Sequence, residues 1–295
     1  ALFSLATGVL LDLARGALTV HERTLFRLLW KSLEPADVLL ADCGLCSFAD
    51  FYFLAQRGVD CVMRNHQRRT VEIRQVKRLG NGDRLIHWLK IKPRPKWLST
   101  EQWQALPDAL LVRELTLTID LPGFRSQTIL VVTTLLDPKQ FPKDALAELY
   151  RKRWMAELFL RDIKTAMGMD VLRCKTPDMV EKELFMHLIA YNLIRTLMLQ
   201  AAAAHALSPF RLSFKGTTAT LRQWAPLMAA ARLDDQRRRA ITQTLLLTLA
   251  TDTLPIRPNR TETRARKRRP KNYQLLNKPR HEFKEIHHRN RYKKP

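Results

Sequence analysis

The chain has 295 residues, 46% hydrophobic and 8% aromatic, enough for one large core or two ordinary ones. Its formal net charge of +23 at pH 7 predicts a polyanionic partner, nucleic acid above all. Residues 257–295 carry fifteen Lys or Arg against three Glu, a balance of +12, which leaves +11 for the rest. No apolar run reaches the roughly 18 residues of a membrane span, and no signal peptide is visible. We therefore expect a cytoplasmic protein.

The first 65 residues have an α/β pattern. In order, we expect strands at 1–8 and 9–16, a helix at 20–33, a strand at 37–42, a helix at 47–57 and a strand at 59–64. Ser47 is a candidate N-cap and Gly58 a helix stop. The run "DVLLAD" at 37–42 is nearly all apolar, which is typical of a strand buried on both faces. It ends at Asp42, with Gly44 just beyond.

From residue 66 to about 140 the sequence pattern changes to strand-like segments. "LGNGD" at 79–83 predicts a hairpin turn, and "STEQWQAL" is the only candidate helix in this stretch. This pattern indicates a β-rich insertion in an α/β fold. Helices return afterwards, and the end of the chain is basic and predicted to be disordered. The expected units are 1–65 (first part of the core), 66–137 (insertion), 138–200 (second part of the core), 201–255 (helical region) and 256–295 (basic tail).

The four cysteines do not form a disulfide framework in a chain of this length. Cys43 and Cys46 form a C-x-x-C pair, but zinc would need a second pair at suitable spacing, and none is present. Packing around a turn is therefore the preferred interpretation of this pair.

The stretch "YRKRWMAELFLRDIK" at 150–164 should lie on a long helix that runs from Pro142 to about Met167. At 100° per residue, Tyr150, Arg153, Glu157 and Lys164 fall within an arc of about 60°. An apolar stripe borders this arc directly, whereas a solvated salt-bridge face usually lies opposite the apolar side. Spacing alone leaves two interpretations open: an ordinary Arg–Glu surface pair, or a site that holds a metal ion and a phosphate backbone.

The spacing Tyr150-x2-Arg153-x3-Glu157-x6-Lys164 resembles the Y-R-E-K signature of the DDE transposases of bacterial insertion sequences, in the insertion-sequence-four group. The segment "DVLLADCGLCSFADF" resembles the part of that family that carries its second catalytic aspartate, which corresponds to Asp42. The order of elements also resembles the family's ribonuclease H-like fold with a β insertion. The resemblance covers about residues 1–200.

The resemblance implies metal-dependent DNA cleavage and strand transfer at insertion-sequence ends. Two Mg²⁺ or Mn²⁺ ions suit in-line displacement at phosphorus, and such hard ions prefer carboxylate oxygens. Asp42 and Glu157 would be the catalytic metal ligands. Tyr150, Arg153 and Lys164 would contact DNA. Double-stranded DNA, both element ends and target, is the implied partner, and pairing of two ends implies a homodimer.

The family uses a third carboxylate on a first, central strand, which should lie upstream of residues 1–8. Asp12 is the only early candidate, and by topology it falls on a later strand. We therefore expect that the chain is N-terminally truncated, that two strand edges lack partners, and that the chain alone is inactive. An in-frame upstream segment ending a strand with Asp would show an intact gene.

Two other functions stay open. One is a non-catalytic DNA-binding remnant that occupies element ends and inhibits an intact transposase; the other is a nuclease of the same fold without strand transfer. We expect His187, Asn192 and Arg195 to serve in packing and solvent contact. Trp154 could lie near a DNA end. The basic run 266–269 is expected to bind phosphate without sequence specificity.

Overall fold

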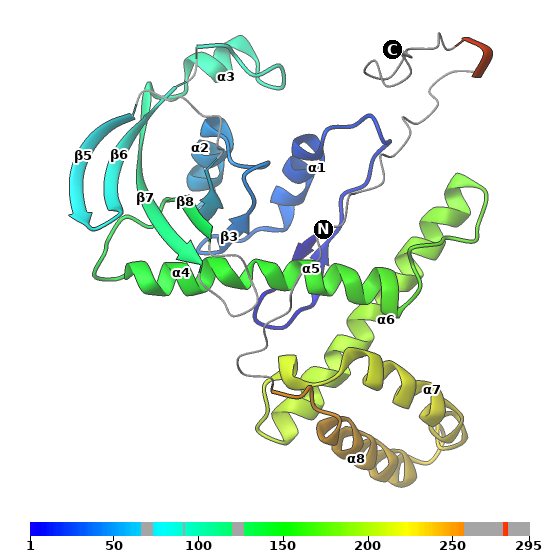
Figure 1. Ribbon diagram of the computed structural model, residues 1–295. Helices are drawn as coiled ribbons and strands as arrows, with labels where there is room; N and C mark the ends of the chain where they lie inside the picture. The colour runs from blue at the N-terminus through cyan, green and yellow to red at the C-terminus, as the bar shows by residue number, and fades with distance from the viewer. Residues whose placement is uncertain (66–72, 91, 120–126, 257–279, 283–295) are drawn as a thin grey trace, which may run out of the picture.

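The computed structural model describes residues 1–65, 73–90, 92–119, 127–256 and 280–282 (Figure 1). The strands are β1 (Leu2–Phe3), β2 (Leu10–Asp12), β3 (Val38–Ala41), β4 (Asp60–Arg64), β5 (Ile73–Gly80), β6 (Asp83–Leu89), β7 (Ala109–Ile119) and β8 (Gln127–Thr133). The α-helices are α1 (Glu22–Leu28), α2 (Phe48–Gln56), α3 (Thr100–Gln104), α4 (Lys143–Lys152), α5 (Trp154–Arg161), α6 (Pro177–Ala204), α7 (Phe214–Ala230) and α8 (Asp235–Thr251). The fold is mixed α/β, compatible with the expected ribonuclease H-like class.

The main sheet has six strands in the order β3-β4-β8-β7-β6-β5. β3 and β4 are parallel, and every other neighbouring pair is antiparallel. Strands predicted for the insertion at 66–137 form as expected, yet β8 pairs with β4, so the sheet continues from the core into the insertion without a break. Among the described residues, β1 and β2 form a separate antiparallel pair.

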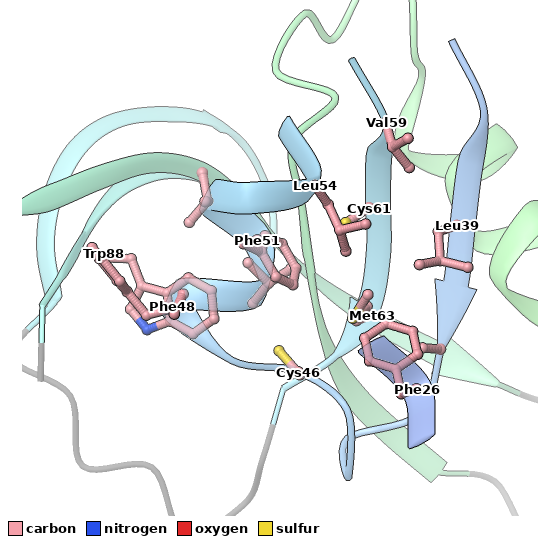
Figure 2. Close-up of a cluster of buried hydrophobic side chains, with 14 of the residues drawn as sticks. Phe26, Leu39, Cys46, Phe48, Phe51, Leu54, Val59, Cys61, Met63 and Trp88 are labelled. Atoms are coloured by element: carbon pink, nitrogen blue, oxygen red, sulfur yellow. The ribbon is translucent and has the colours of Figure 1, made fainter. Parts of the chain in front are cut away.

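Helices cover both faces of the sheet. On one face, α1 and α2 pack Phe26, Phe48, Phe51 and Leu54 against Cys61, Met63, Trp88 and Val112 of the strands. Figure 2 shows this cluster, with the side chain of Cys46 inside it. On the other face, α4 packs Leu146 and Tyr150 against Val62, Leu115, Leu117, Ile129 and Val131. Because successive strand residues face opposite ways, β4 supplies Cys61 and Met63 to one core and Val62 to the other.

A third apolar cluster lies away from the sheet. It joins β2, α5, α6, α7 and α8, and α6 carries the chain from the end of α5 to the α7–α8 pair (Figure 1). α6 supplies Leu188, Tyr191, Met198 and Ala201 to this cluster. The predicted helical region at 201–255 therefore forms part of a core that begins in the first twelve residues.

Local signals explain several boundaries. Ser47 caps α2 as predicted, because its Oγ accepts a hydrogen bond from the Asp50 N–H at 3.2 Å. Gly58 follows α2 with a φ of +72°, a left-handed conformation that favours glycine. The helix predicted at "STEQWQAL" is α3, which begins at a capping box formed by Ser99 and Gln102.

The prediction that 37–42 is buried on both faces is wrong in part. Leu39 and Ala41 of β3 are buried, but Val38 is 39% exposed and Leu40 is only half-buried. The reason is that β3 lies at the edge of the sheet among the described strands, with β4 on one side only.

The predicted disorder of the basic tail falls almost wholly on 257–279 and 283–295, outside the described residues. No helix of the described part has the length and apolar character to span a bilayer.

Candidate metal and DNA site at the end of strand β3

Asp42 follows the last residue of β3. Leu40, two residues earlier, packs with the cluster beneath α4, and the two-residue alternation of a strand directs Asp42 toward the same face. The chain turns at once: Asp42 Oδ1 accepts the Cys43 N–H at 2.7 Å, and the Asp42 carbonyl accepts the Leu45 N–H at 3.0 Å. This turn leaves the Asp42 residue exposed.

Glu157 lies on α5, in nearly one line with α4 (Figure 1). The helix predicted from 142 to 167 forms, but it tightens at Arg153, between α4 and α5, where the Ala156 N–H bonds to the Arg153 carbonyl at 3.1 Å. Arg153 Nη2 lies 3.3 Å from Glu157 Oε1. The Glu157 side chain is 46% exposed, and the Arg153 side chain is 24% exposed. The predicted Arg–Glu contact is therefore present, at the edge of the packed interface.

Tyr150 connects the helix to the strand end. Its ring is 4% exposed, in the core beneath α4. Burial raises the pKa of Tyr150 to about 12; the positive charge of Arg153 opposes this, and the negative charge of Asp42 adds to it. The guanidinium carbon of Arg153 lies 6.0 Å from the Tyr150 ring centroid. The charges of Asp42, just after β3, and of Arg153, on the helix, both act on the Tyr150 phenol. Arg153 in turn contacts Glu157.

Lys164 lies further along the same line of helix and is exposed. It belongs to a π-turn, Asp162–Ala166, that follows α5 directly. The regular 100° spacing used to place Lys164 on the Glu157 side therefore does not extend to this residue, because a π-turn holds more residues per turn than an α-helix. Its position relative to Glu157 depends on that turn.

The two carboxylates suit a hard divalent cation. Asp42 and Glu157 are both exposed, and each offers carboxylate oxygens, the ligand type that Mg²⁺ and Mn²⁺ prefer. Mg²⁺ usually takes one or two protein carboxylates and keeps several waters. Within the described ranges, no group of three or more His, Cys, Asp or Glu side chains is arranged to hold a metal. Asp42 and Glu157 are thus each of the ligand type that such an ion takes.

A groove of about 340 Å³ runs beside this site. One wall is the open edge of β3 with Asp37–Leu40, the other is the segment Ala1–Ala6, and Arg153 and Ala156 line it from the helix. Arg153 Nε is buried and has no hydrogen-bond partner among the described residues. Within the described part of the chain, the groove therefore combines an unpaired edge of β3, apolar walls and a buried donor without a partner.

The structure gives the early alternative Asp12 a local role. Ser32 Oγ donates a hydrogen bond to Asp12 Oδ2 at 2.6 Å, and the Leu13 N–H donates to Oδ1 at 2.7 Å. The Ser32 hydrogen bond is the largest cause that lowers the pKa of Asp12. The two cysteines of the C-x-x-C pair lie apart, as packing around a turn predicts: Cys46 is buried in the core of Figure 2, Cys43 is half-buried, and neither forms a disulfide.

Two residues that the sequence assigned only to packing have specific partners. Asn192 on α6 accepts the Leu10 N–H and donates to the Leu10 carbonyl, both at 2.9 Å, as a neighbouring strand would. Arg195 bonds to Asp162 at the start of the π-turn, at 2.7 Å. The Asp162–Arg195 pair joins positions 33 residues apart, so no local spacing in the sequence points to it. Trp154 is 42% exposed, and the run 266–269 lies outside the described residues.

Comparison with known proteins identifies the family of the chain. A family model described as "Transposase DDE domain" matches residues 1–193, which include Asp42 and Glu157. The chain is also similar to the transposase InsG for insertion sequence element IS4 of Escherichia coli (strain K12), with 33% identity over 137 residues. That match covers 46% of this chain and 29% of the relative. Because the family model covers well over half of the sequence, this chain belongs to the transposase DDE domain family.

Proposed function

We propose that this chain carries part of the catalytic site of a transposase that cleaves DNA and transfers strands at insertion-sequence ends. Asp42 and Glu157 hold the divalent metal, Mg²⁺ or Mn²⁺, with two ions in the complete enzyme. When bound, such ions stabilise the attacking and leaving oxygens of an in-line displacement at phosphorus. Tyr150, Arg153 and Lys164 bind DNA.

One observation carries this proposal: Tyr150 is packed where the charges of Asp42 and Arg153 both act on its phenol, and Arg153 contacts Glu157. Asp42 and Glu157, which are remote in sequence, are thus connected through Tyr150 and Arg153. Arg153 is well suited to DNA phosphate, because its planar guanidinium presents a fork of N–H donors. Tyr150, as a neutral phenol at physiological pH, offers a hydrogen-bond donor and does not repel a phosphate.

The groove along β3 supports the proposal that one more strand belongs to the complete site. An extended segment there would pair with the free edge of β3, cover the apolar walls and bring a polar group to the buried Arg153 Nε. A carboxylate at the end of that strand, beside Asp42, would be the third metal ligand. In this proposal residues 1–295 bind DNA and do not cleave it alone.

The second candidate function follows from the same open edge. A chain that binds element ends but lacks a ligand would act as a non-catalytic DNA-binding protein that inhibits an intact transposase. Charge favours DNA as the partner in both cases, since the net charge is +23. Pairing of two ends would make the active form a homodimer in the cytoplasm.

The test uses a supercoiled plasmid that carries the insertion-sequence ends flanking the gene. Residues 1–295, with Mg²⁺ or Mn²⁺, are expected to bind the ends in a salt-dependent way and leave the plasmid intact. Nicking that Asp42→Asn and Glu157→Gln both abolish would contradict inactivity of the chain and keep the reaction class. If the chain also lowers nicking by an intact relative, the inhibitor function is supported. Absence of salt-dependent binding would overturn both candidates.

A further inference from the structure

Arg195 is a buried charge next to α5, the helix that carries Glu157. It lies on α6, and its side chain is only 5% exposed. Its Nη2 donates to Asp162 Oδ2 at 2.7 Å, and its Nε donates to the Tyr191 hydroxyl at 3.1 Å. Burial raises the pKa of Asp162, and the positive charges of Arg195 and Arg161 oppose that rise. The charge of Arg195 therefore favours the ionised form of Asp162, and loss of either partner would leave the other charge uncompensated in the core.

An aromatic enclosure fixes the guanidinium. The Arg195 Cζ lies 4.9 Å from the ring centroid of Phe159, 5.4 Å from that of Tyr191 and 5.0 Å from that of Phe214. These rings come from α5, α6 and α7, so the cation joins three helices. The Tyr191 hydroxyl donates to the Gly8 carbonyl at 2.6 Å, which connects the same network to the β1–β2 pair.

The carboxylate partner stands at an unusual place in the backbone. Asp162 is the first residue of the π-turn Asp162–Ala166, and its carbonyl accepts the Met167 N–H at 3.0 Å. One residue beyond Met167, Gly168 has a φ of +76°, and the Asp170 N–H bonds back to the Lys164 carbonyl at 3.1 Å. π-turns are rare and need support from their surroundings. The buried Asp162–Arg195 contact supplies support at the first residue of this one.

We propose that Asp162 and Arg195 are a positioning pair: they hold the π-turn after α5 and thereby fix the direction in which Lys164 meets DNA phosphate. The phosphate contact rests on the proposed function, whereas the hold on the turn does not. A regular α-helix through 162–166 would rotate Lys164 relative to Glu157, since the turn would then contain fewer residues. Neither Asp162 nor Arg195 touches the reacting atoms.

The first experiment measures hydrogen exchange in the free protein. Asp162→Asn keeps the shape and removes the charge, so it should lower the protection of the Met167 and Asp170 amides at least tenfold. Asp83→Asn is the matched control, because it breaks another buried Arg–Asp pair, Asp83–Arg113 at 2.6 Å in the sheet. Exchange is compared at equal global stability, set with denaturant. Unchanged protection in Asp162→Asn, or an equal loss in the control, would overturn the proposal.

The second experiment measures how DNA affinity depends on salt. Lys164→Ala should lower the magnitude of the log–log slope by about 0.9, as expected for one lost phosphate contact. Asp162→Asn should lower it by a similar amount, and the double variant should lose no more than either single variant. Arg195→Lys, which keeps the charge, should retain part of the slope. A full slope in Asp162→Asn, or additive losses in the double variant, would contradict the positioning role.

The two experiments separate the inference from the proposed function. If Lys164→Ala leaves the slope unchanged, the phosphate role of Lys164 in the proposed function is wrong. The exchange measurement then still decides whether the pair holds the turn, because it involves no DNA. A loss of protection in Asp162→Asn together with an unchanged slope, where Lys164→Ala lowers that slope, would make the pair merely structural.

Discussion

The guanidinium of Arg153 lies 3.3 Å from the carboxylate of Glu157, one helical turn away, and 6.0 Å from the ring of Tyr150. Arg153 therefore stands between a buried aromatic residue and an exposed acid. Its Nε has no partner among the described residues, although that atom is buried. Arg153 thus has one contact with Glu157 and one buried donor without a described partner.

Replacing Arg153 should therefore separate stability from DNA binding. The exposed Arg153–Glu157 pair is worth at most about 1 kcal/mol, so Arg153→Ala should change the free energy of unfolding little. The same change should weaken DNA binding clearly, and Arg153→Lys should restore the charge but not the fork of donors. Denaturant unfolding and fluorescence anisotropy measure the two effects. A loss of stability above about 2 kcal/mol with unchanged DNA affinity would assign Arg153 to the fold.

Tyr150 predicts a fall in stability at alkaline pH. Burial raises its pKa to about 12 in the folded chain, above the ordinary tyrosine pKa of 10.0, so the folded state keeps a proton that the unfolded state loses. Its contribution is fully present below pH 10 and is lost as pH rises toward 12. Tyr150→Phe should flatten the decline of unfolding free energy between pH 10 and 12. An equally steep decline in that variant would show that Tyr150 titrates normally.

The Asn192 side chain should be a structural requirement. It satisfies both backbone groups of Leu10, a buried residue, so Asn192→Ala leaves an N–H and a carbonyl without their partner. We expect a loss of about 1–3 kcal/mol in the free energy of unfolding. Thr196→Ala, one turn further on at an exposed position, is the control and should change it by less than about 0.5 kcal/mol. Equal effects of the two variants would refute the strand-like role of Asn192.

The buried Asp83–Arg113 pair should behave differently from the Arg153–Glu157 pair. The Arg113 side chain is fully buried, and it also donates to the Phe141 carbonyl at 2.6 Å, just before α4 begins. Arg113→Met leaves Asp83 as an unpaired buried charge and should cost about 3–5 kcal/mol. Adding Asp83→Asn should recover part of that loss, because the uncompensated charge is gone. A double variant less stable than the single one would contradict this account.

The residues that the sequence placed correctly are those governed by local rules. Ser47 and Gly58 delimit α2 because capping depends on near neighbours, and the Arg153–Glu157 contact follows from helical spacing. Long-range pairing decided the rest. The apolar composition of β3 predicted burial on both faces. Full burial also needs a neighbouring strand at each edge, and β3 has β4 on one side only among the described strands. A regular helical wheel could not predict the π-turn that contains Lys164, because the residue that supports this turn, Arg195, lies on another helix.

We propose that Asp42 and Glu157 meet at one divalent metal, and cleavage of the protein by bound iron tests this most directly. Fe²⁺ prefers the same ligands as Mg²⁺ closely enough to replace it, and with ascorbate and peroxide it cuts the backbone nearest to it. We expect two cuts in the same protein, one near residue 42 and one near residue 157. Excess Mg²⁺ should suppress both cuts, and both should be lost in Asp42→Asn and in Glu157→Gln. A cut at only one of these places, or cuts that survive the loss of either carboxylate, would contradict it.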